Sequence, residues 1–394
     1  MLDSIGEMSI QELRSCYPVL SKVVYLNTGS VGLCPNEVVR KTLRAVGYLE
    51  REGLNAYERI DSRMEMVRAK VASLLGAQAE EIAFTGNATD GVNIVAWGLD
   101  WPDDAEVLIS DQEHPAMLYP WHHLQSFGGP RVKMFRVDPD PTVTLSNVRS
   151  CLTARTALIA CSHVSCQTGI RLPVREICRL AVERGILCFL DGAQAVGQFP
   201  VNVNELGCDF YTTNGHKWLG GPKGTGMLYI RRDRLDMVKP RYVGGSKGIG
   251  WLPQGRLEFK PSALRYEYGT RGVAVYAGLG AALDWNRRLG WAACERRMRE
   301  LSCYLKDRLS DLPGVKLLTP REWPLSSAMT SFVVAGRDPQ ELYDHFWQRY
   351  KLLVRKVDEL GAIRVSNAYY NTVEELDLLL RGTEEVLQMK GRAC

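Results

Sequence analysis

Short apolar runs recur through the first two thirds of the chain, and each ends at small or polar residues, a pattern typical of buried strands. Helix-like spacing of apolar residues fills many of the intervals, as in Pro173–Arg184, which Gly185 is expected to end. Alternating strands and helices predict an α/β fold with a mainly parallel sheet, which binds ligands at the carboxyl ends of its strands. The seven expected strands are Ile82–Thr85, Val107–Ser110, Val132–Val137, Ala157–Cys161, Leu187–Asp191, Phe210–Thr212 and Gly226–Ile230.

The pattern changes near Val273, where long helical stretches take over. This change predicts a second, smaller α/β domain. Its expected elements are helices at Val275–Leu289, Ala292–Leu312 and Thr372–Met389 and short strands at Ser331–Val334 and Ile363–Val365. The expected division of the chain is an N-terminal segment (1–30) that packs with the small domain, a large domain (31–268) and the small domain (269–394). Gly and Pro are frequent in Gly244–Pro261, where we expect a mobile loop.

Composition and charge restrict the partners of the protein. Of 394 residues, 45% are hydrophobic and 24% charged, which suffices for a sizeable core, and a net charge of +4 gives no basis for a nucleic-acid partner. No apolar run approaches the ~20 residues that cross a bilayer. The segment Met1–Ile10 carries Asp3 and Glu7 and does not resemble a signal peptide. We therefore expect a cytoplasmic protein that binds neither nucleic acid nor membrane.

Lys217 is the first candidate for chemistry. It lies in a Gly-flanked turn between two apolar strands, within the segment Phe210–Gly226. A loop lysine is usually a solvated charge, but a lysine between two apolar strands is costly to bury unless it is used. A partly buried neutral amine of this kind can form a Schiff base with a carbonyl group.

Asp191 ends the apolar strand that begins at Leu187. An acid in this place often caps a helix or a turn. It can also hold a proton on the ring nitrogen of pyridoxal phosphate (PLP), whose protonated ring stabilises a carbanion. Asp191 precedes Lys217 by 26 residues with one expected strand between them, a natural separation for two neighbouring strand ends.

Two further strand ends carry polar residues. After Ile82–Thr85 the chain turns through small residues into a helix expected to begin near Thr89, and a helix N-terminus with free N–H groups is an anion site. His114 follows the strand Val107–Ser110, and its flat ring could stack on an aromatic cofactor. Each feature alone is also common in α/β turns without a ligand.

Taken together and in this order, these four elements resemble the class V aminotransferases, fold-type-I PLP enzymes that include cysteine desulfurases, isopenicillin N epimerase and cyst(e)ine C–S lyases. The resemblance runs from Tyr25–Gly32 to Arg364, and the DGAQ and GHK segments at Asp191 and Lys217 carry most of it. It implies PLP as the cofactor, a small-molecule amino acid as the substrate and chemistry at the amino acid's Cα.

The resemblance also implies a role for each matching residue. Lys217 is the Schiff-base lysine and proton shuttle, Asp191 pairs with the ring nitrogen, and Arg364 clamps the substrate carboxylate, a bidentate task suited to guanidinium. The remaining expected cofactor contacts are Gln194 at the phenolic oxygen, His114 stacked on the ring, Ala88, Thr89 and His216 at the phosphate, and Asn214 beside them. Thr270, in Tyr266–Arg271, resembles a phosphate contact donated by the partner subunit, so a homodimer with interfacial active sites is expected.

Three positions depart from the desulfurase pattern. Asn214 stands where desulfurases often have Ser or Thr, and Cys166 stands where many relatives have Asn or an aromatic residue. No cysteine lies between Cys303 and Cys394, whereas a desulfurase needs a nucleophilic cysteine shortly before the carboxylate arginine. Persulfide-forming desulfurase activity is therefore not expected.

Three reactions remain open, because β-elimination, epimerisation and transamination all start from the same Cα carbanion. The stretches around Thr85–Trp101 and Leu108–Pro115 resemble cyst(e)ine C–S lyases, whereas Tyr25–Gly32 and Tyr268–Arg271 resemble isopenicillin N epimerase. We favour a lyase acting on a cysteine-like amino acid over an epimerase or an aminotransferase. A PLP-fold protein that has lost catalysis is the non-enzymatic alternative.

Overall fold

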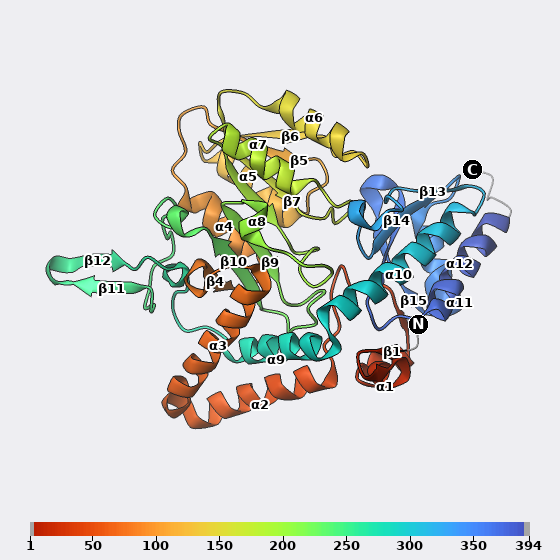
Figure 1. The fold of residues 1–394 in the computed structure, drawn as a ribbon, viewed down its shortest axis with the longest axis horizontal. Coiled ribbons are helices and arrows are strands. Elements are labelled where there is room, and N and C mark those ends of the chain that lie inside the picture. The colour runs from red at the N-terminus through yellow and green to blue at the C-terminus, as the bar shows by residue number, and fades with distance from the viewer. Residues whose placement is uncertain (1–3, 390–394) are drawn as a thin grey trace.

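The computed structural model describes residues 4–389. At its centre lies a seven-stranded sheet with the order β4-β10-β9-β8-β7-β5-β6 (Figure 1). Only β10 runs antiparallel to its neighbours, so the other six strands point the same way. This confirms the expected fold class. The strands are β4 (Ile82–Thr85), β5 (Glu106–Ser110), β6 (Arg131–Phe135), β7 (Thr156–Ser162), β8 (Leu187–Asp191), β9 (Phe210–Asn214) and β10 (Gly226–Ile230).

Both faces of this sheet are buried, which explains why its strands read as continuous apolar runs. In β7, Leu158 and Ala160 belong to one apolar cluster, whereas Ile159 and Cys161 belong to another. The first cluster includes side chains of α4 (Ala88–Gly98) and α5 (Pro115–Ser126). The second includes side chains of α3 (Tyr57–Leu75), α7 (Val174–Glu183) and α9 (Ala274–Leu289), so helices cover each face.

A second, antiparallel sheet with the order β13-β14-β17-β16 forms the C-terminal part. It packs with three helices around a separate apolar cluster, which also includes Leu26 from the N-terminal segment. Near Leu26, β3 (Val24–Tyr25) pairs with β15 (Leu352–Leu353). The elements of this part are α10 (Trp291–Ser310), β13 (Val315–Leu317), β14 (Met329–Val334), α11 (Pro339–Tyr350), β16 (Arg355–Val357), β17 (Ala362–Ser366) and α12 (Val373–Gln388).

The long helix α9 packs against α2 (Asn36–Glu52) and α3, on the large-sheet side of the molecule (Figure 1). The division of the chain at residues 30 and 268 stays a prediction. No helix within residues 4–389 combines the length and the apolar character that crossing a bilayer requires.

The sequence predicts a mobile loop at Gly244–Pro261, but the central residues of this segment form two strands and not a loop, and the expected mobility stays a prediction. Strands β11 (Ile249–Leu252) and β12 (Arg256–Phe259) pair there as an antiparallel hairpin that projects from the body of the molecule (Figure 1). Pro253 and Gly255 form the connecting turn, with Gly255 at a φ of 74°. The Gly and Pro content therefore marks a hairpin turn and not a structureless segment.

Candidate active site

The polar strand ends predicted from the sequence converge on one cavity of about 220 Å³ at the carboxyl edge of the large sheet. Because β10 runs opposite to both β4 and β9, the carboxyl ends of β4 and β9 lie at the same edge as those of β5, β7 and β8. Eight of the ten predicted site residues line this cavity: Ala88, Thr89, His114, Asp191, Gln194, Asn214, His216 and Lys217. Arg364 and Thr270 lie elsewhere.

Lys217 sits in the turn that follows β9. The turn is closed by hydrogen bonds from Gly221 N to Gly215 O (2.7 Å) and from Gly220 N to Lys217 O (3.1 Å). The N-terminal segment packs so tightly on it that a Cβ at Gly32 would lie 1.8 Å from the Lys217 carbonyl oxygen. Burial lowers the pKa of the Lys217 amine, which favours the neutral, nucleophilic form.

Asp191 ends β8, next to β9 in the sheet, and is buried. Its Oδ1 accepts a hydrogen bond from Ala193 N at 2.8 Å. Burial raises the pKa of Asp191, and the positive charge of Lys217 opposes that shift. A carboxylate so placed is suited to pair with a cationic ring nitrogen, which would stabilise its charged form further.

His114 is the N-cap of α5, and its Nδ1 accepts a hydrogen bond from Ala116 N at 3.0 Å. This bond assigns the proton of the neutral ring to Nε2. Burial, aided by the charges of Lys217, Arg355 and Arg364, lowers the pKa of His114 to about 4. The ring is therefore neutral at physiological pH and can stack on another flat ring without adding charge.

Glu113 is a buried residue of this site that the sequence reasoning missed. Its carboxylate accepts hydrogen bonds from Ser110 Oγ (2.5 Å), Ser162 N (2.7 Å) and Ser162 Oγ (2.5 Å). These bonds tie the loop that carries His114 to the end of β7. Burial raises the pKa of Glu113 to about 7.

The N-terminus of α4 also lines the cavity. Asn87 caps this helix by accepting a hydrogen bond from Asp90 N (3.0 Å), so Ala88 and Thr89 occupy its first turn. Asn214 Oδ1 and His216 Nδ1 are buried without a hydrogen-bond partner in the described part of the chain. A helix N-terminus beside unpartnered polar atoms fits a phosphate group.

Gln194 also lines the cavity, but both the nitrogen and the oxygen of its side-chain amide already form hydrogen bonds within the protein. Its Nε2 donates to Gly29 O (2.8 Å), and its Oε1 accepts from Trp218 Nε1 (2.8 Å). The expected contact of Gln194 with the phenolic oxygen of PLP stays a prediction.

Arg364 lies behind the wall of the cavity and is fully buried. Its Nη1 donates to Cys166 O (2.5 Å) and its Nη2 to Ser30 Oγ (2.9 Å), whereas its Nε has no partner in the described residues. Cys166 itself lines the cavity, and burial raises the pKa of its thiol to about 11. A neutral thiol, not a thiolate, therefore faces the site.

Arg355 is the guanidinium that lines the cavity, and the sequence reasoning missed it. It stands directly opposite Arg364 in the register of β16 and β17. Within residues 4–389 it has neither a hydrogen-bond nor an acidic partner. No motif marks Arg355 in the sequence, because only the pairing of two strands brings it to the site.

Thr270 lies on an exposed turn and lines a different cavity, together with Thr85, Asn93 and Tyr268. It cannot belong to the set around Lys217 within one chain. This position agrees with, but does not test, the expectation that Thr270 serves a neighbouring subunit.

Comparisons with known proteins agree with this geometry. A family model described as aminotransferase class-V matches residues 24–379. The chain is 32% identical to an isopenicillin N epimerase of Amycolatopsis lactamdurans over 92% of this chain and 95% of that protein. It is 31% identical to a probable cysteine desulfurase of Mycobacterium leprae over the whole of both chains. A solved cystine C–S lyase, in complex with its product cysteine persulfide, superposes with a TM-score of 0.85 at 29% identity, covering 93% of this chain and 99% of that one.

Proposed function

The chain belongs to the aminotransferase class-V family of PLP-dependent enzymes, and from this premise we propose that it is a C–S lyase acting on a cysteine-like amino acid. The residues around the cavity fit the cofactor. Ala88, Thr89 and His216 would hold its phosphate, His114 would cover its ring, and Asp191 would hold the proton on its ring nitrogen. Bound PLP supplies the electron sink for chemistry at Cα.

In this proposal Lys217 takes the proton from Cα of the substrate. Burial lowers the pKa of the amine and so favours its neutral form, which is the form that can accept a proton. Loss of the sulfur group from Cβ follows, and water completes the reaction. With cystine, the balance is cystine plus water giving pyruvate, ammonia and cysteine persulfide.

The observation that separates the proposed lyase from a cysteine desulfurase is the absence of a sulfur-accepting cysteine in the segment before Arg364. The printed sequence has no cysteine from 304 to 393, so the sulfur would have to leave on a small product. The likeness to the solved cystine C–S lyase supports this outcome.

Arg355 narrows the class of substrate. A guanidinium without an acidic partner beside a cavity favours an anionic ligand group, which it can bind in bidentate fashion. If Arg364 and Arg355 serve two different carboxylates, the substrate is a diacid such as cystine. The proposal therefore ranks cystine above S-alkyl cysteines, which have one carboxylate.

A substrate panel tests the proposal. The holoenzyme is mixed with cystine, S-methylcysteine, cysteine and alanine, and pyruvate, ammonia and persulfide are measured separately. Pyruvate and ammonia in equal amounts from cystine support the lyase. A keto acid formed together with pyridoxamine phosphate would contradict the lyase proposal and indicate an aminotransferase.

Epimerisation is the second candidate, favoured by the 32% identity to an isopenicillin N epimerase. An epimerase returns the proton to the opposite face of Cα without losing a side-chain group. Turnover in deuterium oxide separates the two, because an epimerase yields Cα-deuterated amino acid of inverted configuration and no pyruvate.

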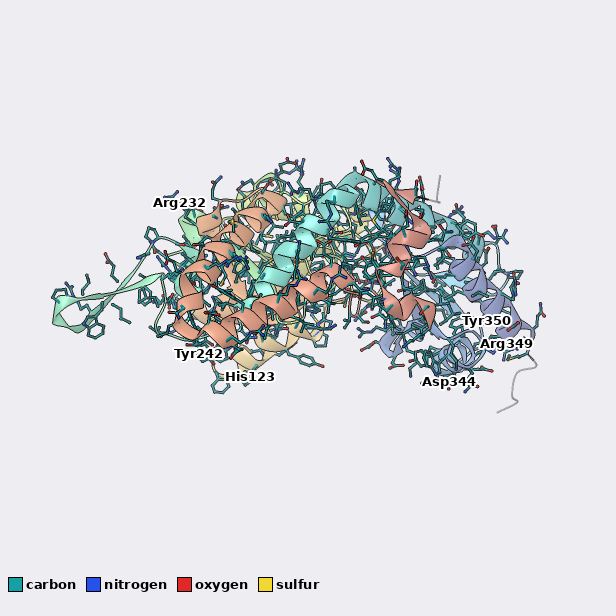
Figure 2. The ribbon with its side chains drawn as sticks, turned by 90° about the horizontal axis from the view of Figure 1, so that it is seen from below. His123, Arg232, Tyr242, Asp344, Arg349 and Tyr350 are labelled. Atoms are coloured by element: carbon teal, nitrogen blue, oxygen red, sulfur yellow. The ribbon has the colours of Figure 1, made fainter. Side chains whose placement is uncertain are left out.

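We further propose that the enzyme is a homodimer. Large apolar side chains remain exposed near the Thr270 turn and the projecting hairpin, among them Trp251 (74% exposed) and Tyr242 (71%). Figure 2 shows Tyr242 at the end of the molecule from which the hairpin projects, opposite Tyr350. Exposed apolar groups gathered in this way favour a protein interface. Sedimentation of the active holoenzyme as a 44 kDa monomer would contradict a dimer.

A further inference from the structure

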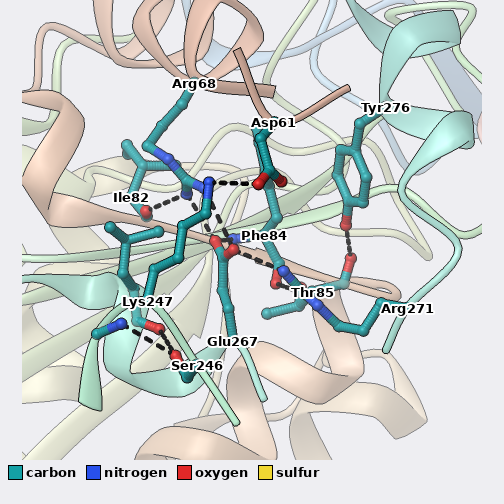
Figure 3. Close-up of polar contacts among 12 residues, drawn as sticks. Asp61, Arg68, Ile82, Phe84, Thr85, Ser246, Lys247, Glu267, Arg271 and Tyr276 are labelled. Atoms are coloured by element: carbon teal, nitrogen blue, oxygen red, sulfur yellow. Dashed lines mark hydrogen bonds and ion pairs between the residues drawn. The ribbon is translucent and has the colours of Figure 1, made fainter. Parts of the chain in front are cut away.

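An ion cluster centred on the buried carboxylate of Glu267 lies at the base of the turn that carries Thr270, and Figure 3 shows Glu267 with Arg68 and Arg271. The carboxylate of Glu267 accepts bonds from Arg68 Nη1 (2.6 Å) and Nη2 (3.2 Å), and from Arg271 Nη2 (2.6 Å). Glu267 and Arg68 are both buried, whereas Tyr268, Gly269 and Thr270 are exposed. The cluster thus joins α3 to the two ends of an outward-facing turn.

The same side chains occupy the free edge of the large sheet. β4 is an outer strand that pairs only with β10, so its outward backbone groups lack a neighbouring strand. Phe84 N donates to Glu267 Oε1 (2.6 Å), and Phe84 O accepts from Arg271 Nη1 (2.7 Å). Arg68 Nη1 bonds Ile82 O at 2.8 Å. Side chains therefore replace the missing strand and set the register of the turn against β4.

The geometry leaves the turn little freedom. A buried carboxylate held by two guanidiniums and one backbone N–H is strained or uncompensated if any partner moves. Two further contacts hold the neighbouring segment around Gly245. Lys247 forms an ion pair with Asp61 at 3.0 Å, and Gly269 N donates a hydrogen bond to Gly245 O at 2.9 Å. The side chains of an exposed turn make few contacts of their own, so the conformation of this turn depends on the buried residues beneath it, and the contacts described above hold it in place.

We infer that Glu267, held by Arg68 and Arg271, is a positioning residue that sets Thr270 for the cofactor phosphate of the neighbouring subunit. This inference rests on the proposed homodimer. It assigns the cluster a role in trans: the Glu267 of one chain controls PLP retention in the other chain's site. The bond of Glu267 to β4 suggests the opposite role, in the site of its own chain, because β4 leads into Ala88 and Thr89 of that same site.

Hybrid dimers of two differently tagged chains separate the two roles. In the first hybrid, a Glu267→Gln chain is paired with a Lys217→Ala chain, so the only site with Lys217 receives an intact turn. In the second hybrid, the wild-type chain is paired with a Lys217→Ala/Glu267→Gln chain, so the only site with Lys217 receives an altered turn. The readout is the rate at which lysine-bound PLP, followed by its absorbance, is lost to a PLP-scavenging protein.

We expect wild-type release from the first hybrid and about tenfold faster release from the second, the effect of about 1.4 kcal/mol lost at one charge-assisted contact. A Thr270→Ala chain in place of Glu267→Gln should reproduce the pattern. Faster release from the first hybrid only, or equally from both, would overturn the inference while leaving the dimer and the lyase proposal standing. A fully loaded monomer would overturn the dimer proposal and this inference with it.

Glu65 supplies the matched control. It bonds Arg68 Nε at 3.1 Å from the exposed side of α3 and touches no part of the turn. Glu65→Gln should leave release unchanged in both hybrids. If Glu267→Gln does not fold, Arg271→Lys replaces it, because lysine keeps the charge but cannot hold Glu267 and Phe84 O together. Unchanged release in the second hybrid with folded Arg271→Lys would overturn the inference.

Discussion

Arg355 and Arg364 stand directly opposite each other in the register of β16 and β17, and within residues 4–389 neither forms an ion pair with an acidic residue. Burial, with the charge of Arg355, lowers the pKa of Arg364 to about 10. Arg364 is fixed by the Cys166 carbonyl and Ser30, whereas Arg355 is exposed and lines the cavity. Two like charges on paired residues are stabilised by an anion, and a substrate carboxylate is the anion that the proposed reaction provides.

Arg355→Gln should raise KM for cystine about tenfold or more, because a charge-assisted bond contributes roughly 1.5–3 kcal/mol. KM for S-methylcysteine should change much less if Arg355 serves the second carboxylate. Steady-state kinetics with both substrates measure the difference. Lys356→Gln is the control, since the neighbouring Lys356 bonds Asp358 and does not line the cavity. Equal effects of Arg355→Gln on both substrates would remove the diacid preference.

Lys217→Ala should abolish the visible absorbance of lysine-bound PLP and lower kcat by orders of magnitude, because the covalent link and the base are both lost. Lys223→Ala, at an exposed position just after this turn, should keep the band and the rate. A Lys217→Ala enzyme that retains both would mean that another lysine carries the cofactor.

Asp191→Asn should leave PLP bound but lower kcat by at least about tenfold, or 1.4 kcal/mol in the barrier. An amide cannot hold the ring nitrogen protonated, so the electron sink weakens. Asp191→Glu should do less harm because it keeps the charge. Absorbance titration and turnover, measured on the same samples, separate loss of cofactor from loss of rate. An unchanged kcat in the Asn variant would refute the proposed pairing.

Glu113 should make the apoprotein less stable as the pH rises. Its folded-state pKa is raised to about 7 from an unfolded value near 4.5 by burial, so the folded state binds the proton more tightly. The free energy of unfolding should then fall between about pH 4.5 and pH 7, by at most about 3 kcal/mol from this group. Urea unfolding at several pH values, with wild-type and Glu113→Gln compared, isolates the contribution. A difference between the two proteins that does not vary with pH would contradict it.

Local sequence determined the large sheet, because each strand buries both faces and so reads as an apolar run that ends in polar residues. The cavity around Lys217 and Asp191 could be predicted for the same reason, since parallel strands that end in functional residues bring them to one edge. Gly244–Pro261 shows the limit of such reasoning. Its Gly and Pro residues are turn signals, and only the pairing of Ile249 with Phe259 distinguishes a hairpin from a loop.

The tertiary structure decided what depends on side chains that meet from distant parts of the chain. Arg355 enters the site through its register opposite Arg364, Glu113 through bonds to Ser162 on another strand, and Arg68 through its contact with Glu267 199 residues away. Arg355 and Arg68 lie in no motif, and the motif around Glu113 drew attention only to His114, because an ion pair or a hydrogen bond needs proximity in space and leaves no periodic trace in the sequence. The sequence by itself therefore determined the fold and the residues at the strand ends, whereas the folded chain decided which charges surround them.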